Sequence, residues 1–225
     1  MSLSLPLSSS SLKKLGPTRG SAFRQRRLVG FLRIVDEVIA ERGTCRIIDL
    51  GGETQYWEAL RPFWHSRPLS ILMVNPVSQS SPDERLESIQ GDACHLPRFA
   101  DGSFDVVHSN SVIEHVGSWE NKRSMANEVR RLASRYFVQT PNFWFPVEPH
   151  FRTLGLHWMP RPMRRSMLMR KRRGCFHRAT SLDEAHWMLS DSSLLDAREM
   201  FDLFPEATIM REKVLGLTKS LVAVR

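Results

Sequence analysis

Short apolar runs alternate with amphipathic segments along most of the chain. Five runs have the length of buried strands: 45–50, 69–74, 86–90, 104–108 and 135–140. Apolar residues recur at helical spacing in the segments around them: 23–41, 54–63, 119–133 and 193–204. Two further strands, 207–214 and 220–224, close the chain. Alternation of buried strands with helices predicts an α/β protein with a largely parallel sheet.

The turn after the first predicted strand holds Gly51 and Gly52, close behind Asp49. Glycine lets the backbone approach a ligand, and ligands of open α/β sheets bind where the strands end. The dinucleotide fingerprint has three spaced glycines and favours a phosphate, which Asp49 would repel. A carboxylate at this position predicts a ligand that has a cationic amino group and no phosphate, as S-adenosylmethionine has.

Further motifs follow in a fixed order: Gly91-Asp92-Ala93, Leu96-Pro97, and the segment 101–116 with its Ser-Phe-Asp-Val-Val and Val-Ile-Glu-His-Val sequences. With the glycine turn, this series resembles the class I S-adenosylmethionine-dependent methyltransferases, in their type 11 branch. The resemblance covers about residues 27–147 and returns more weakly from Phe204 onward. It implies a doubly wound, mostly parallel seven-stranded Rossmann-like sheet with a helical cap inserted after the fifth strand. The last two strands would form an antiparallel hairpin at the sheet edge.

The resemblance also implies where the cofactor S-adenosylmethionine is bound. Its contacts would be Asp49, Gly51 and Gly52 at the methionine end, Asn75 at the ribose, Asp92 and Ala93 at the adenine, and Asn110 at the end of the fourth strand. Asn75 departs from the acid that many relatives carry, and an amide binds a hydroxyl without charge-assisted strength. Asp92 has an alternative interpretation as a turn-forming residue after glycine.

Two histidines are candidate catalytic bases. His150 lies in the aromatic loop 143–151 after the fifth strand, which in such methyltransferases faces the transferred methyl group. His115 follows Glu114, and the alternative, which we favour, is that this pair orients its loop. Displacement at an activated methyl group depends mainly on positioning, and no hydrolase triad or zinc-protease motif occurs in the sequence.

Composition limits the class of protein. The chain has 225 residues, of which 41% are hydrophobic, so one domain with a sizeable core is expected. Cys45, Cys94 and Cys175 are scattered, which favours neither a disulfide framework nor a metal site and fits a cytoplasmic protein. The formal net charge of +8 favours an anionic partner.

The positive charge is concentrated in two blocks. We expect residues 1–22 to be a disordered basic arm, with organellar targeting by 1–27 as the alternative. Residues 23–225 would form one domain with a cap insertion at about 146–180. The basic block at 161–178 is interleaved with Met, Leu and Trp, and three interpretations stay open. They are peripheral membrane contact through 158–178, a cap over a soluble anionic substrate, and, less favoured, a nucleic-acid surface.

The sequence thus predicts methyl transfer to a small-molecule or lipid-like, anionic acceptor. Three rival functions remain. They are a NAD-dependent oxidoreductase, against which the missing third glycine counts, a non-catalytic binding protein on the same fold, and a nucleic-acid methyltransferase.

Overall fold

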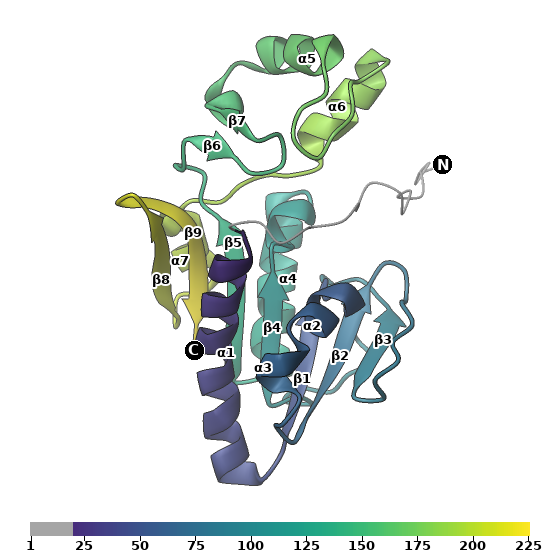
Figure 1. The fold of residues 1–225 in the computed structure, drawn as a ribbon, viewed down its shortest axis with the longest axis vertical. Coiled ribbons are helices and arrows are strands. Elements are labelled where there is room, and N and C mark those ends of the chain that lie inside the picture. The colour runs from purple at the N-terminus through teal and green to yellow at the C-terminus, as the bar shows by residue number, and fades with distance from the viewer. Residues whose placement is uncertain (1–19) are drawn as a thin grey trace. The chain divides into compact units, whose positions relative to one another are not determined.

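The computed structural model describes residues 20–225, so the predicted arm lies outside the described residues as far as residue 19. The chain folds into two compact units, shown as a ribbon in Figure 1. The larger unit contains Phe23–Phe145 and Asp191–Arg225, and the smaller contains Pro146–Ser190. The smaller unit follows the fifth strand, where a cap was expected, but the proposed domain limits stay a prediction.

The larger unit is built on a seven-stranded sheet. Its strands are β1 Cys45–Leu50, β2 Leu69–Asn75, β3 Leu86–Gln90, β4 Val106–Asn110, β5 Arg135–Pro141, β8 Thr208–Val214 and β9 Leu217–Val224. The order across the sheet is β3-β2-β1-β4-β5-β9-β8, with β1 to β5 parallel and β9 antiparallel to both neighbours. The doubly wound, mostly parallel sheet with a closing hairpin is therefore confirmed. The tight hairpin turn is made by Leu215 and Gly216, both at positive φ.

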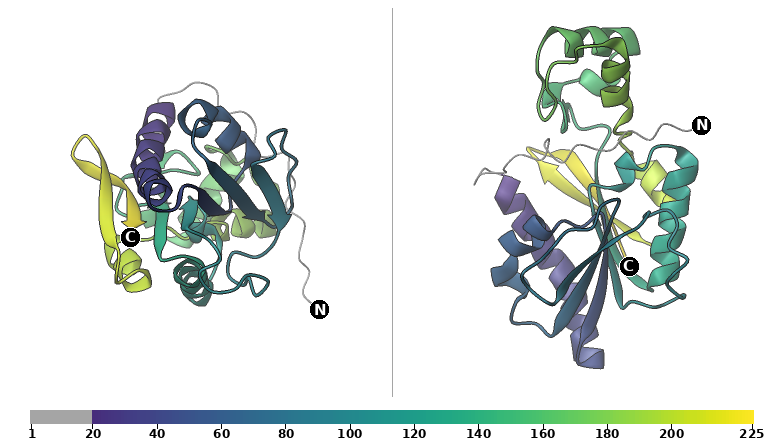
Figure 2. Two further views of the ribbon diagram at one scale, coloured as in Figure 1. Left: turned by 90° about the horizontal axis from the view of Figure 1, so that it is seen from below. Right: turned by 90° about the vertical axis from the view of Figure 1, so that its right-hand side faces the viewer.

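Helices cover both faces of this sheet, as Figure 2 shows. They are α1 Gly20–Arg42, α2 Thr54–Ala59 and α3 Arg61–Trp64 on one face, and α4 Trp119–Leu132 and α7 Ala197–Leu203 on the other. The apolar stripe of α1, which includes Phe31 and Val35, is fully buried against β1, β4 and β5. On the opposite face Met125 and Val129 of α4 enter a second core. Burial of these two stripes fixes the sheet between its helical layers.

One predicted helix is broken in two. The segment expected as a helix over 54–63 forms α2 and α3, which are separated at Leu60. Pro62 explains the break, because proline has no N–H to donate and its ring clashes with the carbonyl four residues earlier. Gly43, at φ +80°, ends α1 where the sequence predicted.

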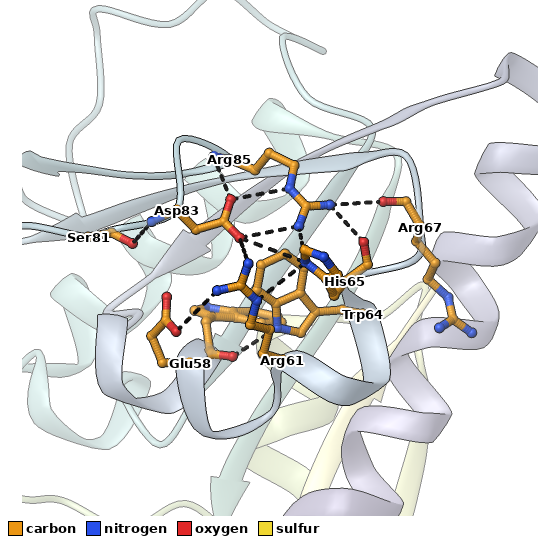
Figure 3. Close-up of polar contacts among 9 residues, drawn as sticks. Glu58, Arg61, Trp64, His65, Arg67, Ser81, Asp83 and Arg85 are labelled. Atoms are coloured by element: carbon orange, nitrogen blue, oxygen red, sulfur yellow. Dashed lines mark hydrogen bonds and ion pairs between the residues drawn. The ribbon is translucent and has the colours of Figure 1, made fainter.

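A cluster of charged residues joins α3 to the connection between β2 and β3 (Figure 3). The Asp83 carboxylate, 8% exposed, lies 3.2 Å from both Arg61 and Arg85. The Arg85 guanidinium lies 4.9 Å from the centre of the Trp64 ring. Its hydrogen bond to Asp83 holds the pKa of that carboxyl below its usual range, against the opposing effect of burial. Because Arg67 and Arg85 lie just before β2 and β3, the cluster stabilises the amino ends of these two strands.

The smaller unit has a core of its own. It consists of a short hairpin, β6 Val147–Glu148 and β7 Thr153–Leu154, the turn η2 Leu156–Trp158, and the helices α5 Arg161–Arg170 and α6 Leu182–Ser190. Phe151, Leu168 and Met188 are buried in one cluster between these elements. Across residues 20–225, no helix is both long and apolar enough to cross a membrane.

Candidate functional site

The carboxyl ends of β1 and β4 define the candidate site. The two strands are adjacent and parallel, with Leu50 paired to Ser109, so they end at the same level. The strand order reverses here, because β2 and β3 extend from one side of this pair and β5 from the other. In open α/β sheets the ligand crevice lies outside the strand ends at such a reversal. Gly51 directly follows β1, and Ser111 directly follows β4.

Both glycines of the turn are required by their surroundings. Gly51 has φ +77°, and a Cβ at this position would overlap the side chain of Val112. A Cβ on Gly52 would overlap the carboxylate of Asp49. The turn therefore packs tightly against the end of β4 on one side and against Asp49 on the other.

Asp49 is buried and engaged within the protein. Its Oδ2 accepts a 2.7 Å hydrogen bond from Trp57 Nε1, and its Oδ1 lies 2.7 Å from His108 Nδ1. The rings of Phe31 and Trp57 surround the imidazole of His108 at centroid distances of 4.7 and 5.3 Å. Both carboxylate oxygens of Asp49 are thus engaged by side chains, and the carboxylate packs closely against Gly52 of the turn. Its contact with the methionine end of a cofactor stays a prediction.

The ends of β1, β2 and β3 are linked in a row. Asn75 Nδ2 donates a hydrogen bond to the carbonyl of Gly52, and Gly91 N donates one of 2.9 Å to the carbonyl of Asn75. Asp92 is exposed, and its Oδ1 accepts a 2.9 Å hydrogen bond from Cys94 N, as a turn-forming aspartate does. Ala93, beside it, is half-buried. The structure thus places these predicted residues along one sheet edge.

A partly buried arginine that was not predicted from the sequence lies near the carboxyl ends of β4 and β5. Arg27 of α1 donates to Asn110 Oδ1 and, over 2.8 Å, to Gln139 Oε1. It also pairs with both carboxylate oxygens of Glu212 in β8, at 3.0 and 2.6 Å. The side chains of Arg27 and Glu212 are only 10% and 19% exposed. No local pattern could reveal a pair separated by 185 positions.

Arg27 also affects the ionisation of Glu212, and Gln139 holds the backbone conformation just after β4. Burial would raise the pKa of Glu212, but the hydrogen bonds and charge of Arg27 lower it below its usual range. Ser111 adopts φ 59°, a left-handed conformation that is costly for a residue other than glycine. Its backbone N–H and its hydroxyl donate 3.0 Å hydrogen bonds to Gln139, which hold this conformation.

Two further residues beside the glycine turn were not predicted. Thr54, the first residue of α2, has a buried Oγ1 without a hydrogen-bond partner in the described part of the chain. Its backbone N–H donates a 3.0 Å hydrogen bond to Gln79 Oε1, from the connection after β2. A buried hydroxyl without a partner beside a glycine turn is a candidate ligand contact.

Glu114 and His115 hold the segment after β4. The buried Glu114 accepts a 2.9 Å hydrogen bond from Thr140 Oγ1 through Oε2. His115 Nδ1 lies 2.8 Å from the carbonyl of Asp191 and 3.4 Å from its carboxylate. Burial opposes the charged form, but the bonds to Asp191 and the charge of Glu114 raise the pKa of His115 to about 9. These contacts support the orienting role, and a role as catalytic base stays a prediction.

His150 belongs to the smaller unit and is oriented by a carboxylate. Glu148 is buried, and its Oε1 lies 2.8 Å from His150 Nδ1, while its Oε2 accepts a 2.5 Å hydrogen bond from Phe151 N. Gly174, at φ +52°, touches the same turn so closely that a Cβ would overlap the backbone of His150 and Phe151. The imidazole is thereby held in one orientation, which suits a proton acceptor, although the catalytic role of His150 stays a prediction.

Residues 69–135 match a family model described as a methyltransferase domain. Over this segment the chain is therefore similar to methyltransferase domains. The matched segment includes Asn75, Asp92, Ala93, Asn110 and His115, and it begins after the glycine turn. The sheet order and this match thus confirm the predicted resemblance to class I methyltransferases of the type 11 branch.

Solved structures share the fold of this chain. The PH0226 protein from Pyrococcus horikoshii OT3 is 14% identical and has a TM-score of 0.52. The alignment covers 92% of this chain and 91% of the PH0226 chain. The selenomethionine-substituted CurJ carbon methyltransferase is 13% identical, with 80% of this chain and 48% of its own covered, at a TM-score of 0.50. At such identities the likeness concerns the fold alone. No curated protein matches the sequence significantly.

Proposed function

We propose that this protein transfers a methyl group from S-adenosylmethionine to a small-molecule or lipid-like acceptor. One observation carries the proposal. The segment that matches the methyltransferase family supplies the strand ends that meet the glycine turn at the reversal of strand order. The ligand crevice expected for this fold therefore lies at the ends of strands that the family match includes.

The residues at this edge fit the cofactor. The exposed carboxylate of Asp92 would accept a hydrogen bond from the adenine amino group, and the backbone N–H of Ala93 would donate one to a ring nitrogen. Asn75 uses its amide nitrogen on Gly52, so its carbonyl oxygen would accept a hydrogen bond from a ribose hydroxyl. The hydroxyl of Thr54 and the backbone of the Gly51 turn would meet the methionine end.

The chemistry requires positioning above all. When bound, S-adenosylmethionine supplies an activated methyl group, whose bonding electrons stay on sulfur as the acceptor's lone pair forms the new bond. Holding the acceptor in line with that bond can contribute on the order of 7–11 kcal/mol. A neutral acceptor also loses a proton, and His150, whose Nδ1 lies 2.8 Å from Glu148 Oε1, is the candidate base that would accept it.

Titration calorimetry tests cofactor binding directly. We expect S-adenosylmethionine and S-adenosylhomocysteine to bind, and NAD not to. Asp92→Asn should weaken S-adenosylmethionine about 10–100-fold, because a charged hydrogen-bond acceptor is lost. Glu84→Gln is the matched control, since Glu84 is an exposed acid just before β3, at the opposite end of that strand from Asp92. Equal affinities in both variants, or preferential binding of NAD, would contradict the proposal.

Turnover needs a second measurement, because binding alone also fits a non-catalytic protein. A metabolite extract is incubated with methyl-labelled S-adenosylmethionine and the protein. A labelled product that forms with the wild type and is reduced in Asp92→Asn supports methyl transfer. Cofactor binding without any S-adenosylhomocysteine production would favour the non-catalytic alternative.

A further inference from the structure

The smaller unit concentrates positive charge that the described residues do not neutralise. Residues 146–190 contain nine Lys or Arg side chains against three acids, within a chain whose formal net charge is +8. Two of these acids are engaged locally, Glu148 with His150 and Glu184 with His177 and Thr180. Within the described residues, these two histidine contacts are the ion pairs of the unit, so its arginines stay uncompensated.

The charged side chains are arranged around two adjacent helices. α5 contacts α6, and most of the basic residues occupy α5 and the segment that follows it. The exposed basic residues of the unit are Arg152, Arg161, Arg170, Lys171, Arg172 and Arg178. Burial, and after it the like charge of Arg161, lowers the pKa of Arg164.

Large apolar side chains are exposed among these charges. Trp158, Met163 and Trp187 are 46%, 54% and 48% exposed, although the unit has a core that buries Phe, Leu and Met side chains. Leu154 and Leu182 are exposed as well. A surface that combines arginines with exposed Trp, Met and Leu is suited to a bilayer interface, where the apolar groups enter the acyl boundary and the cations meet headgroups.

We propose that the smaller unit docks on an anionic lipid surface through α5, α6 and the turns beside them. Nucleic acid offers stacking to tryptophan but no apolar partner for the exposed Leu and Met side chains. A small soluble anion would engage one or two arginines, whereas the exposed cations here extend from Arg161 to Arg178. This surface does not depend on the methyl-transfer reaction.

Vesicle co-sedimentation of the full chain tests the proposal. The probe is phosphatidylcholine vesicles with about one third phosphatidylserine, compared with pure phosphatidylcholine and with rising salt. We expect binding to the anionic vesicles only, weakened by salt. The variant Arg161→Gln, Arg170→Gln, Lys171→Gln, Arg172→Gln should bind at least about tenfold more weakly, because each basic residue near the surface adds to the attraction.

A matched control removes the same charge elsewhere. Arg33→Gln, Arg123→Gln, Arg211→Gln, Lys213→Gln changes four exposed basic residues of the larger unit and should leave vesicle binding within about twofold. Trp158→Ser with Met163→Ser should weaken binding while its salt dependence persists. Soluble glycerophosphoserine should not compete. Equal loss in the two charge variants, competition by the soluble headgroup, or displacement of vesicles by an RNA oligonucleotide would overturn the proposal.

Discussion

At the residue scale, Asn75 is the position where this chain departs most informatively from the pattern that the resemblance implies. The sequence shows an amide where the family resemblance predicts an acid, which suggests weaker binding of ribose. In the structure the amide has a structural role, because its Nδ2 donates a hydrogen bond to the carbonyl of Gly52 and so connects the end of β2 to the glycine turn. A carboxylate cannot donate a hydrogen bond, so an acid here would face that carbonyl as a second acceptor.

Replacing Asn75 by Asp should therefore destabilise the protein. We expect Asn75→Asp to lower the free energy of unfolding by about 1–3 kcal/mol at neutral pH, because a hydrogen bond is replaced by repulsion between two acceptors. Urea denaturation measures this change. Asn127→Asp is the control, since the exposed Asn127 accepts a hydrogen bond from Arg130 through its side-chain oxygen, and Asp keeps that acceptor. An Asn75→Asp protein as stable as the wild type would refute the assignment.

Asp49 shows how far local sequence reasoning reaches at this scale. The strand, the acid and the two glycines were predictable from spacing, since hydrophobic runs and glycine turns are local features. Its partners were not, because His108 lies 59 positions away and Trp57 was assigned only to a helix. Partner identity depends on the register of β1 against β4, which pairs Asp49 with His108 and which no single segment encodes.

At the element scale, α1 does more than cover the sheet. Its apolar stripe was evident from helical periodicity and is buried as predicted. Its polar contribution was hidden, because Arg27 reaches Asn110, Gln139 and Glu212 on three different strands. The helix thus links β4, β5 and β8 through one guanidinium. The break at Leu60 is the converse case, since Pro62 was visible in the sequence and local chemistry alone explains it.

The Arg27–Glu212 pair should determine part of how the free energy of unfolding changes with pH in the acid range. A carboxylate with a lowered folded-state pKa adds stability above its unfolded pKa, about 4.3 for Glu, and that stability is lost as the pH falls through the folded value. Arg27→Gln should cost about 2–4 kcal/mol at pH 7, because it leaves Glu212 largely buried without its cation. The difference from the wild type should shrink below the ordinary pKa of Glu, where protonation of Glu212 removes the interaction.

Chemical denaturation across the acid range measures this dependence. Arg26→Gln is the matched control, because the neighbouring Arg26 is exposed on the same helix. A loss in Arg27→Gln that stays constant from neutral pH to well below the Glu pKa would show that packing, and not charge, accounts for the effect.

At the scale of the whole molecule, the chain contains two separate cores. Every buried residue of the two sheet-face clusters belongs to the larger unit, and the cluster around Phe151 belongs entirely to the smaller one. The chain leaves and re-enters the larger unit at neighbouring points, since Phe143 N donates a 2.8 Å hydrogen bond to the carbonyl of Leu195. The resemblance implied a cap inserted after the fifth strand, but a core of scattered Phe, Leu and Met residues gave no periodic signal.

Replacing 146–190 by a short Gly-Ser linker should therefore leave a folded larger unit. We expect one cooperative urea transition, a midpoint close to that of the same unit in the full chain, and a smaller m-value because less surface is exposed on unfolding. S-adenosylmethionine affinity should stay within a few-fold, since the proposed cofactor contacts all lie in the larger unit, whereas vesicle binding should be lost. Linkers of two lengths separate strain at the junction from loss of the unit. A shortened chain that lacks a cooperative transition with either linker would show that the larger unit depends on the smaller one to fold, whatever its own buried clusters suggest.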